Sequence, residues 1–192
     1  MRAQRSPFQH LLGERFEELP LPVQRIHSIS GPLTAAGLAD VFVTRGSASW
    51  LIRRIARMPR PGRKISVTVS FQPDGRGGER WLRSFAGRHY ASTISTGGKT
   101  ADSLLVERLG LFDLYFRLTP RPGSLEWLLV GWRFLGVPLP AWSIPVIRCR
   151  ESSDAERYVF DIDAAFPVIG PVIHYRGWLI PQEQTNSGAP EI

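Results

Sequence analysis

Hydrophobic and polar residues alternate along much of the chain, and this alternation predicts antiparallel strands. The clearest example is residues 64–71 (KISVTVSF), where apolar side chains at every second position alternate with lysine, serine and threonine. This pattern is typical of a strand that buries one face. Residues 73–78 (PDGRGG) predict a tight reversal, because aspartate and glycine accept turn conformations readily. Residues 64–71 and 79–85 are therefore expected to pair as a hairpin.

Further strands are predicted on both sides of this hairpin. In chain order they are residues 38–45, 87–96, 104–118, 143–150, 157–163 and 172–180. Residues 87–96 either continue the hairpin strand or form the next one. Residues 125–135 are apolar at odd and even positions alike, which fits either a buried strand or a helix packed on the sheet. The periodicity does not distinguish these two alternatives.

The N-terminal part of the chain has helical spacing instead. A first helix is indicated by apolar residues at roughly helical intervals, and Pro20 and Pro22 end it. These apolar residues are Leu11, Leu12, Phe16 and Leu19. His27 follows as a helix-end or core histidine.

A second helix is expected over residues 47–58, which a serine can cap and Pro59 ends. The apolar positions are Trp50, Leu51, Ile55 and Met58, and the basic ones are Arg53, Arg54 and Arg57. The apolar stripe is expected to pack on the sheet while the arginines face water. The alternative is a basic amphipathic helix that lies on a membrane surface.

Together these elements predict an α+β fold. About seven to eight strands and two N-terminal helices, with no later strand–helix alternation, favour a strongly curved antiparallel sheet over a doubly wound one. We expect a half-barrel, lipocalin-like or helix-grip-like. One globular domain is predicted over residues 8–181, between flexible ends at residues 1–7 and 182–192.

The composition indicates a soluble protein. Hydrophobic residues make up 43% of the chain and charged residues 21%, which is ordinary for a globular domain. The longest apolar stretch, residues 125–142, is interrupted by Glu126, Arg133 and two prolines, so it is not expected to span a membrane. A single cysteine, Cys149, and the lack of an apolar segment before Phe8 predict a cytoplasmic protein without an intramolecular disulfide.

The net charge of +7 comes almost entirely from arginine, since Lys64 and Lys99 are the only lysines. The arginines are scattered, whereas a nucleic-acid module concentrates basic residues on one element with aromatic rings for stacking. No nucleic-acid partner is therefore expected. The arginine bias follows either from a G+C-rich gene or from attraction to phosphate or anionic lipid. Only residues 53–64 form a local basic cluster.

Residues 79–85 (ERWLRSF) are the most informative for function. In a strand, Glu79, Trp81, Arg83 and Phe85 share one face, so two opposite charges are interleaved with two large aromatic rings. A charge removed from water needs a partner, so this face suits a partly buried polar site. In the hollow of a curved sheet it would bind a ligand with an apolar body and an anionic end, which arginine can hold bidentately.

Tyr115 and His174 lie on polar strand faces and are further candidates to line the same hollow. The alternative for all these residues is that they face solvent and form cross-strand pairs. Cys149 lies between Arg148 and Arg150, which could lower its thiol pKa, but we interpret it as inert. The histidines are dispersed and no catalytic, phosphate-binding or metal-binding signature is present, so neither a cofactor nor a metal is expected.

Several short motifs together resemble those of a known family. They are Glu79-x-Trp81-x-Arg83-x-Phe85, Glu107-Arg108-x-Gly110, Gly136-x-Pro138-x-Pro140 with Pro145, Pro167-x-x-Gly170 and Tyr175-x-Gly177-x-Leu179-x-Pro181. Over residues 19–181 the chain resembles the bacterial domain-of-unknown-function family 4166. Members of that family occur alone or attached to Rossmann-type oxidoreductase domains that resemble saccharopine dehydrogenases or nucleotide-sugar epimerases. The resemblance implies no activity and no catalytic residues, but it suggests an oxidoreductase partner and a role beside small-molecule metabolism.

Three functional hypotheses follow. The leading one is a module that binds a lipid-like or other amphipathic small molecule in the hollow of the sheet. The second is an enzyme, or an accessory domain to one, in which Arg83 orients an anionic substrate and Glu79 or His174 moves a proton. The third is a membrane-surface or interaction domain that uses residues 50–64.

Overall fold

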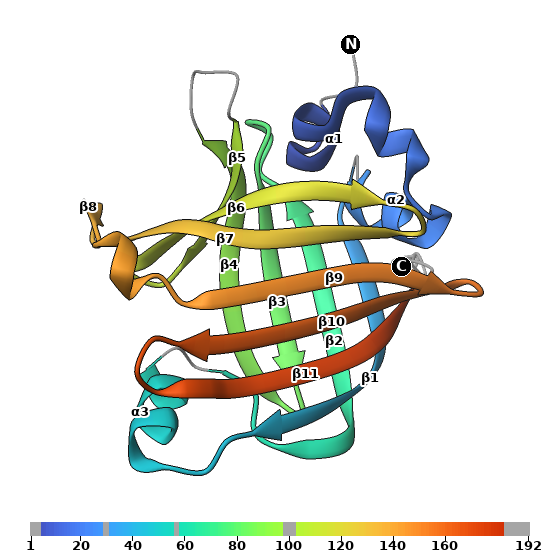
Figure 1. Ribbon diagram of the computed structural model, residues 1–192. Helices are drawn as coiled ribbons and strands as arrows, with labels where there is room; N and C mark the ends of the chain where they lie inside the picture. Colours follow the sequence, from blue (N-terminus) through green and yellow to red (C-terminus); the bar gives the residue numbers. More distant parts are fainter. Residues whose placement is uncertain (1–4, 29–30, 56–57, 98–102, 183–192) are drawn as a thin grey trace, which may run out of the picture.

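The computed structural model describes residues 5–28, 31–55, 58–97 and 103–182. Within them, one antiparallel sheet of eleven strands curls into a closed barrel (Figure 1). The strands are β1 (Leu33–Val43), β2 (Gly62–Pro73), β3 (Glu79–Phe85), β4 (Arg88–Gly97), β5 (Leu104–Leu109), β6 (Phe112–Arg121), β7 (Ser124–Phe134), β8 (Val137–Pro138), β9 (Val146–Asp154), β10 (Arg157–Phe166) and β11 (Gly170–Pro181). Each strand from β1 to β7 pairs with the next one along the chain. β7 also pairs with β9, β9 pairs with β10, β10 pairs with β11, and β11 pairs with β1. The short β8 pairs only with β7, so ten of the eleven described strands form the wall.

The predicted α+β fold with an antiparallel sheet is confirmed, but the half-barrel of about seven to eight strands is wrong. Residues 104–118 contain two strands, because a turn at Gly110 separates β5 from β6, and its φ of 61° suits glycine. Residues 125–135, which fitted a strand or a helix, fall almost entirely in β7. Pairing of β7 with both β6 and β9 closes the sheet, and closure removes the unpaired edges that an open sheet has.

Helices mark the two ends of the barrel (Figure 1). α1 (Pro7–Leu12), the 3₁₀ helix η1 (Gly13–Glu18) and α2 (Leu21–His27) lie at the end where β1 begins, which we call the closed end. α3 (Ser47–Ile55) follows β1 and lies at the opposite end, which we call the open end. No helix among the described residues has both the length and the apolar character needed to cross a bilayer.

The first predicted helix is divided in two. Gly13, with a φ of 55°, ends α1, and the chain continues as η1. Ser6 caps α1 by accepting a hydrogen bond from the Gln9 backbone N–H, while the Gln9 side chain accepts one from the Ser6 N–H. Ser6 and Pro7, which the predicted flexible end included, are therefore buried parts of this helix start. Residues 1–4 and 183–192 of the predicted ends lie outside the described residues.

Alternation along the strands sorts side chains between the interior and the outer face. The predicted hairpin is confirmed, with Val67 opposite Phe85 and Phe71 opposite Trp81. Its inward side chains join one continuous core. On β11, Gly177 leaves room for the Phe160 ring, because a Cβ at that position would lie 2.7 Å from the ring's Cζ atom.

Candidate functional site

A buried ion pair lies in the middle of the barrel interior. Arg83 Nη2 on β3 lies 2.9 Å from Glu107 Oε1 on β5, and both side chains are 13% exposed. Arg83 Nη1 donates to Ser92 Oγ at 2.6 Å. The guanidinium also lies over two rings, 4.7 Å from the Trp81 centroid and 5.6 Å from the Tyr90 centroid. The partner that a buried arginine needs is therefore supplied by the protein itself.

Two tyrosines complete this polar group. The side chains of Tyr90 and Tyr175 are hydrogen-bonded to each other. Burial raises the pKa of Tyr90 to about 12 and the pKa of Tyr175 well above its ordinary value, so both hydroxyls stay protonated at neutral pH. Burial works to lower the pKa of Arg83, but attraction to Glu107, Tyr90 and Tyr175 and the hydrogen bond to Glu107 together outweigh it and leave that pKa raised. Arg83 is thus a permanent cation whose charge Glu107 balances.

The polar group lines a cavity of about 160 Å³ inside the barrel. Most of the remaining wall is apolar, and it includes Val69, Phe71, Leu114, Phe116, Phe160 and Ile173. Pockets for drug-sized ligands measure roughly 300–1,000 Å³, so this cavity suits a narrow apolar group.

A larger hollow of about 1040 Å³ opens beside α3 at the open end. It shares Met58, Pro59 and Phe85 with the inner cavity, so these three residues lie between the two spaces. The basic residues in its wall are Arg53, Arg54, Arg60 and Arg88. Their charges attract an anionic group.

Helix α3 leaves most of its predicted apolar stripe exposed, although Ile52 packs against the core and Arg54 faces solvent. The exposed apolar residues are Trp50 (58%), Leu51 (51%) and Ile55 (63%). Arg53 turns toward the barrel instead, where it donates to the Thr44 carbonyl oxygen at 2.8 Å and hydrogen-bonds to Ser49. The carbonyl oxygens where β1 ends need donors, and a guanidinium supplies several from one side chain. Only Met58 of the predicted stripe lines the interior, so the expectation that the stripe packs on the sheet is wrong.

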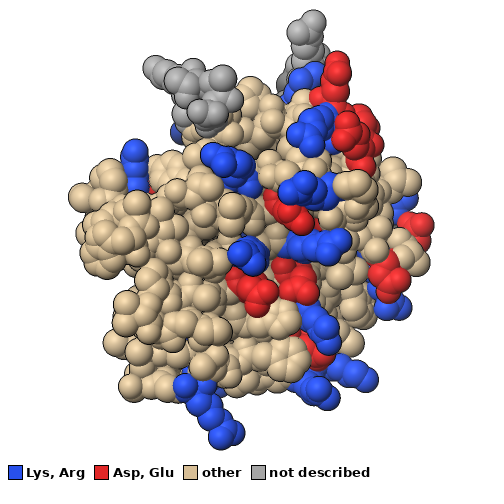
Figure 2. Space-filling model, in the orientation of Figure 1, with Lys and Arg blue, Asp and Glu red and all other residues tan. Residues whose placement is uncertain are grey.

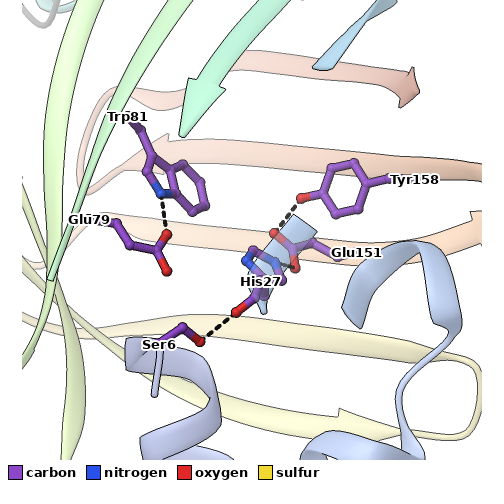
Figure 3. Close-up of polar contacts among 6 residues, drawn as sticks. All are labelled: Ser6, His27, Glu79, Trp81, Glu151 and Tyr158. Atoms are coloured by element: carbon purple, nitrogen blue, oxygen red, sulfur yellow. Dashed lines mark hydrogen bonds and ion pairs between the residues drawn. The ribbon is translucent and has the colours of Figure 1, made fainter. Parts of the chain in front are cut away.

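At the closed end, a buried polar cluster joins the helices to the barrel (Figure 3). His27, the last residue of α2, has its Nε2 atom 2.7 Å from Glu151 Oε2 on β9. Tyr158 on β10 donates to the other oxygen of Glu151 at 2.5 Å. The Ser6 hydroxyl donates to the His27 carbonyl oxygen. His27 and Glu151 are almost completely buried, which confirms His27 as a helix-end and core histidine.

Aromatic rings and a second carboxyl group surround His27. The imidazole stacks on Phe8 with 3.7 Å between ring centroids, and Glu79 lies on the side away from Glu151 (Figure 3). Glu79 accepts a hydrogen bond from Trp81 Nε1 at 2.8 Å. Burial raises the pKa of Glu79, although the Trp81 hydrogen bond and attraction to His27 oppose the rise. Among the residues that the structure describes, Glu79 Oε1 and His27 Nδ1 have no hydrogen-bond partner.

The structure divides the predicted site residues into three groups. Those that line the inner cavity are Trp81, Arg83 and Phe85. Glu79 is on the same inward face but belongs to the closed-end cluster. Tyr115 and His174 lie on the outer face, because their strand neighbours Phe116 and Tyr175 point inward. Placing Tyr115 and His174 in the hollow was therefore wrong, since a strand presents successive side chains to opposite faces.

A group of possible metal ligands lies on the outer face. Ligand atoms of Asp161, Asp163 and His174 lie within 4.8 Å of one another. The residues opposite on the neighbouring strands are Arg148, Arg150 and Arg176. Figure 2 shows positive and negative side chains alternating over β9, β10 and β11. Because the guanidinium groups would repel a cation, this group is better explained as part of a row of alternating charges across the strands.

Sequence reasoning missed the polar partners of the predicted residues. These partners are Tyr90, Glu107, Glu151 and Tyr175. A signal existed for Glu107, which stands between Leu105 and Leu109 on the inward parity of β5. A single charge on an otherwise apolar face indicates a buried partner elsewhere.

Cys149 faces the barrel interior and lines the inner cavity. Burial raises the pKa of its thiol well above the ordinary value. Its neighbours Arg148 and Arg150 lie on the opposite face of β9, so they do not lower the thiol pKa as their place in the sequence suggested. This environment disfavours a reactive thiolate.

Comparison with curated proteins finds no match for this chain. A family model, "Domain of unknown function (DUF4166)", matches residues 19–179. The match covers most of the chain and includes every strand of the barrel wall apart from the last residues of β11. The chain therefore belongs to the DUF4166 family.

Proposed function

We propose that this protein binds a small amphipathic molecule, with its apolar part inside the barrel and its anionic end in the basic hollow beside α3. The observation that carries the proposal is the junction of the two hollows at Met58, Pro59 and Phe85. The inner cavity is narrow and largely apolar, and the outer hollow is wide and lined with arginine. Together they match a molecule with a thin tail and a charged head.

The charge balance of the interior supports this orientation. An anion placed against Arg83 would also meet Glu107, which lies 2.9 Å from the guanidinium. The chain between Val43 and Ile65 contains seven basic residues and no aspartate or glutamate. The interior therefore attracts an anion less strongly than the basic segment at the open end does.

Calorimetric titration with dodecanoate tests the proposal, with 1-dodecanol as the uncharged probe. Val69→Phe adds bulk to the cavity wall and is expected to weaken dodecanoate binding by roughly tenfold or more, through steric exclusion. Thr68→Phe is the matched control, because Thr68 is the neighbouring residue on the exposed face. Circular dichroism of both variants separates lost binding from lost folding.

The position of the anionic end is tested separately with Arg60→Gln. This change is expected to weaken the binding of dodecanoate roughly fivefold and to leave the binding of 1-dodecanol unchanged, since only dodecanoate carries a charge that Arg60 attracts. No dodecanoate binding to the folded wild-type protein, or equal weakening by Val69→Phe and Thr68→Phe, would contradict binding in the barrel.

The predicted enzyme has less support from the geometry. It required Arg83 to share an open space with Glu79 or His174, but Glu79 does not line the cavity and His174 is on the outer face. An oxidoreductase partner stays a prediction from the family resemblance.

A further inference from the structure

The open end of the barrel exposes apolar side chains on several separate connections. α3 presents Trp50, Leu51 and Ile55, each more than half exposed. The chain between β7 and β9 presents Leu135 and Trp142, and the turn between β10 and β11 presents Val168. Antiparallel topology brings these connections to one end, because all of them lie where β1, β7 and β10 finish. A group of exposed apolar residues of this extent marks an interaction surface.

The charges at the two ends differ as well. Seven basic residues and no acidic residue lie between Val43 and Ile65, the segment that contains α3. At the closed end, η1 carries exposed carboxylates at Glu14, Glu17 and Glu18. Figure 2 shows acidic and basic side chains mixed at the top right, beside the N-terminal helices, and Lys and Arg side chains projecting at the bottom edge. Arg5, Arg15 and Arg25 balance these three carboxylates, so residues 5–27 have no net charge, whereas the open-end segment is strongly basic.

We propose that the open end docks on the surface of an anionic lipid bilayer. Tryptophan and aliphatic side chains of a short amphipathic helix insert at the level of the headgroups, and neighbouring arginines bind lipid phosphates. α3 supplies Trp50, Leu51 and Ile55 for insertion and Arg54 for phosphate contact. The closed end, where the charges of residues 5–27 balance, then points away from the membrane, so the basic open end favours one orientation.

Two other occupants of this surface fit the structure less well. A second copy that docked by the same face would place the two basic segments against each other, which like charges disfavour. The described ends of the chain do not cover it either, because Arg5 precedes α1 and Gln182 hydrogen-bonds to Thr34, both at the closed end. An anionic membrane is the partner that satisfies both the apolar and the basic residues.

This inference does not depend on a ligand in the barrel. Docking uses the exposed side of α3 and the open-end connections, and the proposed function uses the two hollows; Trp50 and Arg54 belong to both, because they also line the outer hollow. Vesicle binding without dodecanoate, and dodecanoate binding without vesicles, are separate measurements. Failure of one therefore leaves the other standing.

Flotation of the full chain with vesicles tests the proposal. We expect binding to vesicles of equimolar phosphatidylcholine and phosphatidylglycerol, little binding to phosphatidylcholine alone, and release by high salt. Ile55→Ser is expected to weaken binding roughly tenfold, because it removes an inserted apolar side chain. Arg54→Glu is expected to weaken it roughly twentyfold, since each basic charge near the surface contributes about fivefold.

Matched controls lie at the closed end. Leu21→Ser changes an apolar residue that is 63% exposed, the same fraction as Ile55, and Arg80→Glu makes the same charge change on exposed β3 surface. Both are expected to change vesicle binding by less than about twofold. Absence of flotation, or equal losses in the controls and the α3 variants, would overturn the proposal. A solution dimer that Ile55→Ser disrupts, without vesicle binding, would overturn it in favour of self-association.

Discussion

The closed end and the open end of the barrel use similar residue types for opposite purposes. At the closed end, Phe8 and His27 stack on each other beside Trp81 and Trp127 and are completely buried. At the open end, Trp50 and Ile55 lie on the outside of α3, and arginines line a hollow. One end is part of the folded core, and the other carries a hollow that shares Met58, Pro59 and Phe85 with the inner cavity.

This difference shows that the position of a helix in the topology decides what its apolar residues do. α1 and α2 lie across the mouth of the barrel, where α1 contacts β4, β5 and β6 and α2 contacts β9 and β10, so their apolar faces have a surface to cover. α3 contacts mainly β11, and Arg53 anchors it through the Thr44 carbonyl oxygen. Stability should therefore depend on the closed end, and interactions with other molecules on the open end.

The largest expected effect comes from truncating one aromatic residue at each end. Phe8→Ala is expected to lower the free energy of unfolding by roughly 3–5 kcal/mol, because it leaves a cavity beside His27. Trp50→Ala should change it by no more than about 0.5 kcal/mol, since that side chain is 58% exposed. Urea denaturation measures both. Equal losses would show that the two ends contribute alike.

A second comparison uses two histidine–carboxylate pairs with similar distances between nitrogen and oxygen. His27–Glu151 is buried with atoms 2.7 Å apart, whereas His174–Asp161 is 2.8 Å long with side chains 35% and 46% exposed. Glu151→Ala is expected to cost roughly 3 kcal/mol, because it leaves the buried His27 and Tyr158 without their acceptor. Asp161→Ala should cost roughly 0–1 kcal/mol. Thermal or urea unfolding checks the difference, and a smaller loss for Glu151→Ala than for Asp161→Ala would contradict it.

The closed end should also make stability depend on pH. Burial raises the pKa of Glu79 above its ordinary value of 4.5 in the folded protein, so the folded state holds the proton more tightly than the unfolded chain does. The unfolded chain loses its proton first as pH rises, so this group's contribution to stability falls from near pH 4.5 until the raised pKa is passed. Glu79→Gln should remove that fall, whereas Glu18→Gln on the exposed surface should keep it. Identical pH profiles for Glu79→Gln and wild type would refute the assignment.

The smallest effect concerns access to Cys149 through the open end. A thiol reagent should modify this buried residue far more slowly in the folded protein than in urea. Met58→Ala widens the junction of the hollows and is expected to speed modification by roughly threefold, while Leu21→Ala at the closed end is expected to leave the rate unchanged. Faster modification in the Leu21 variant would contradict this prediction, because it would show that the reagent reaches Cys149 through the closed end.

Part of the candidate site was predictable from local pattern. The inward face of residues 79–85 follows from alternation alone, and the turn at residues 73–78 pairs it with β2. The pattern also required a partner for Arg83 but could not identify it, because Glu107 lies two strands away at a separation of twenty-four positions along the chain. Tyr115 and His174 have polar neighbours much as Arg83 does, and only the direction of the barrel interior distinguishes them.

The sequence by itself determined most of the strands and the hairpin, because alternation and turn residues act over a few neighbouring positions. The tertiary structure decided that the sheet closes, that α3 leaves most of its predicted apolar stripe exposed, and that Glu107 neutralises Arg83. Each of these depends on contacts between residues far apart in the chain. Whether an amphipathic helix buries its apolar side depends on which surface lies beneath it, and local periodicity carries no information about that surface.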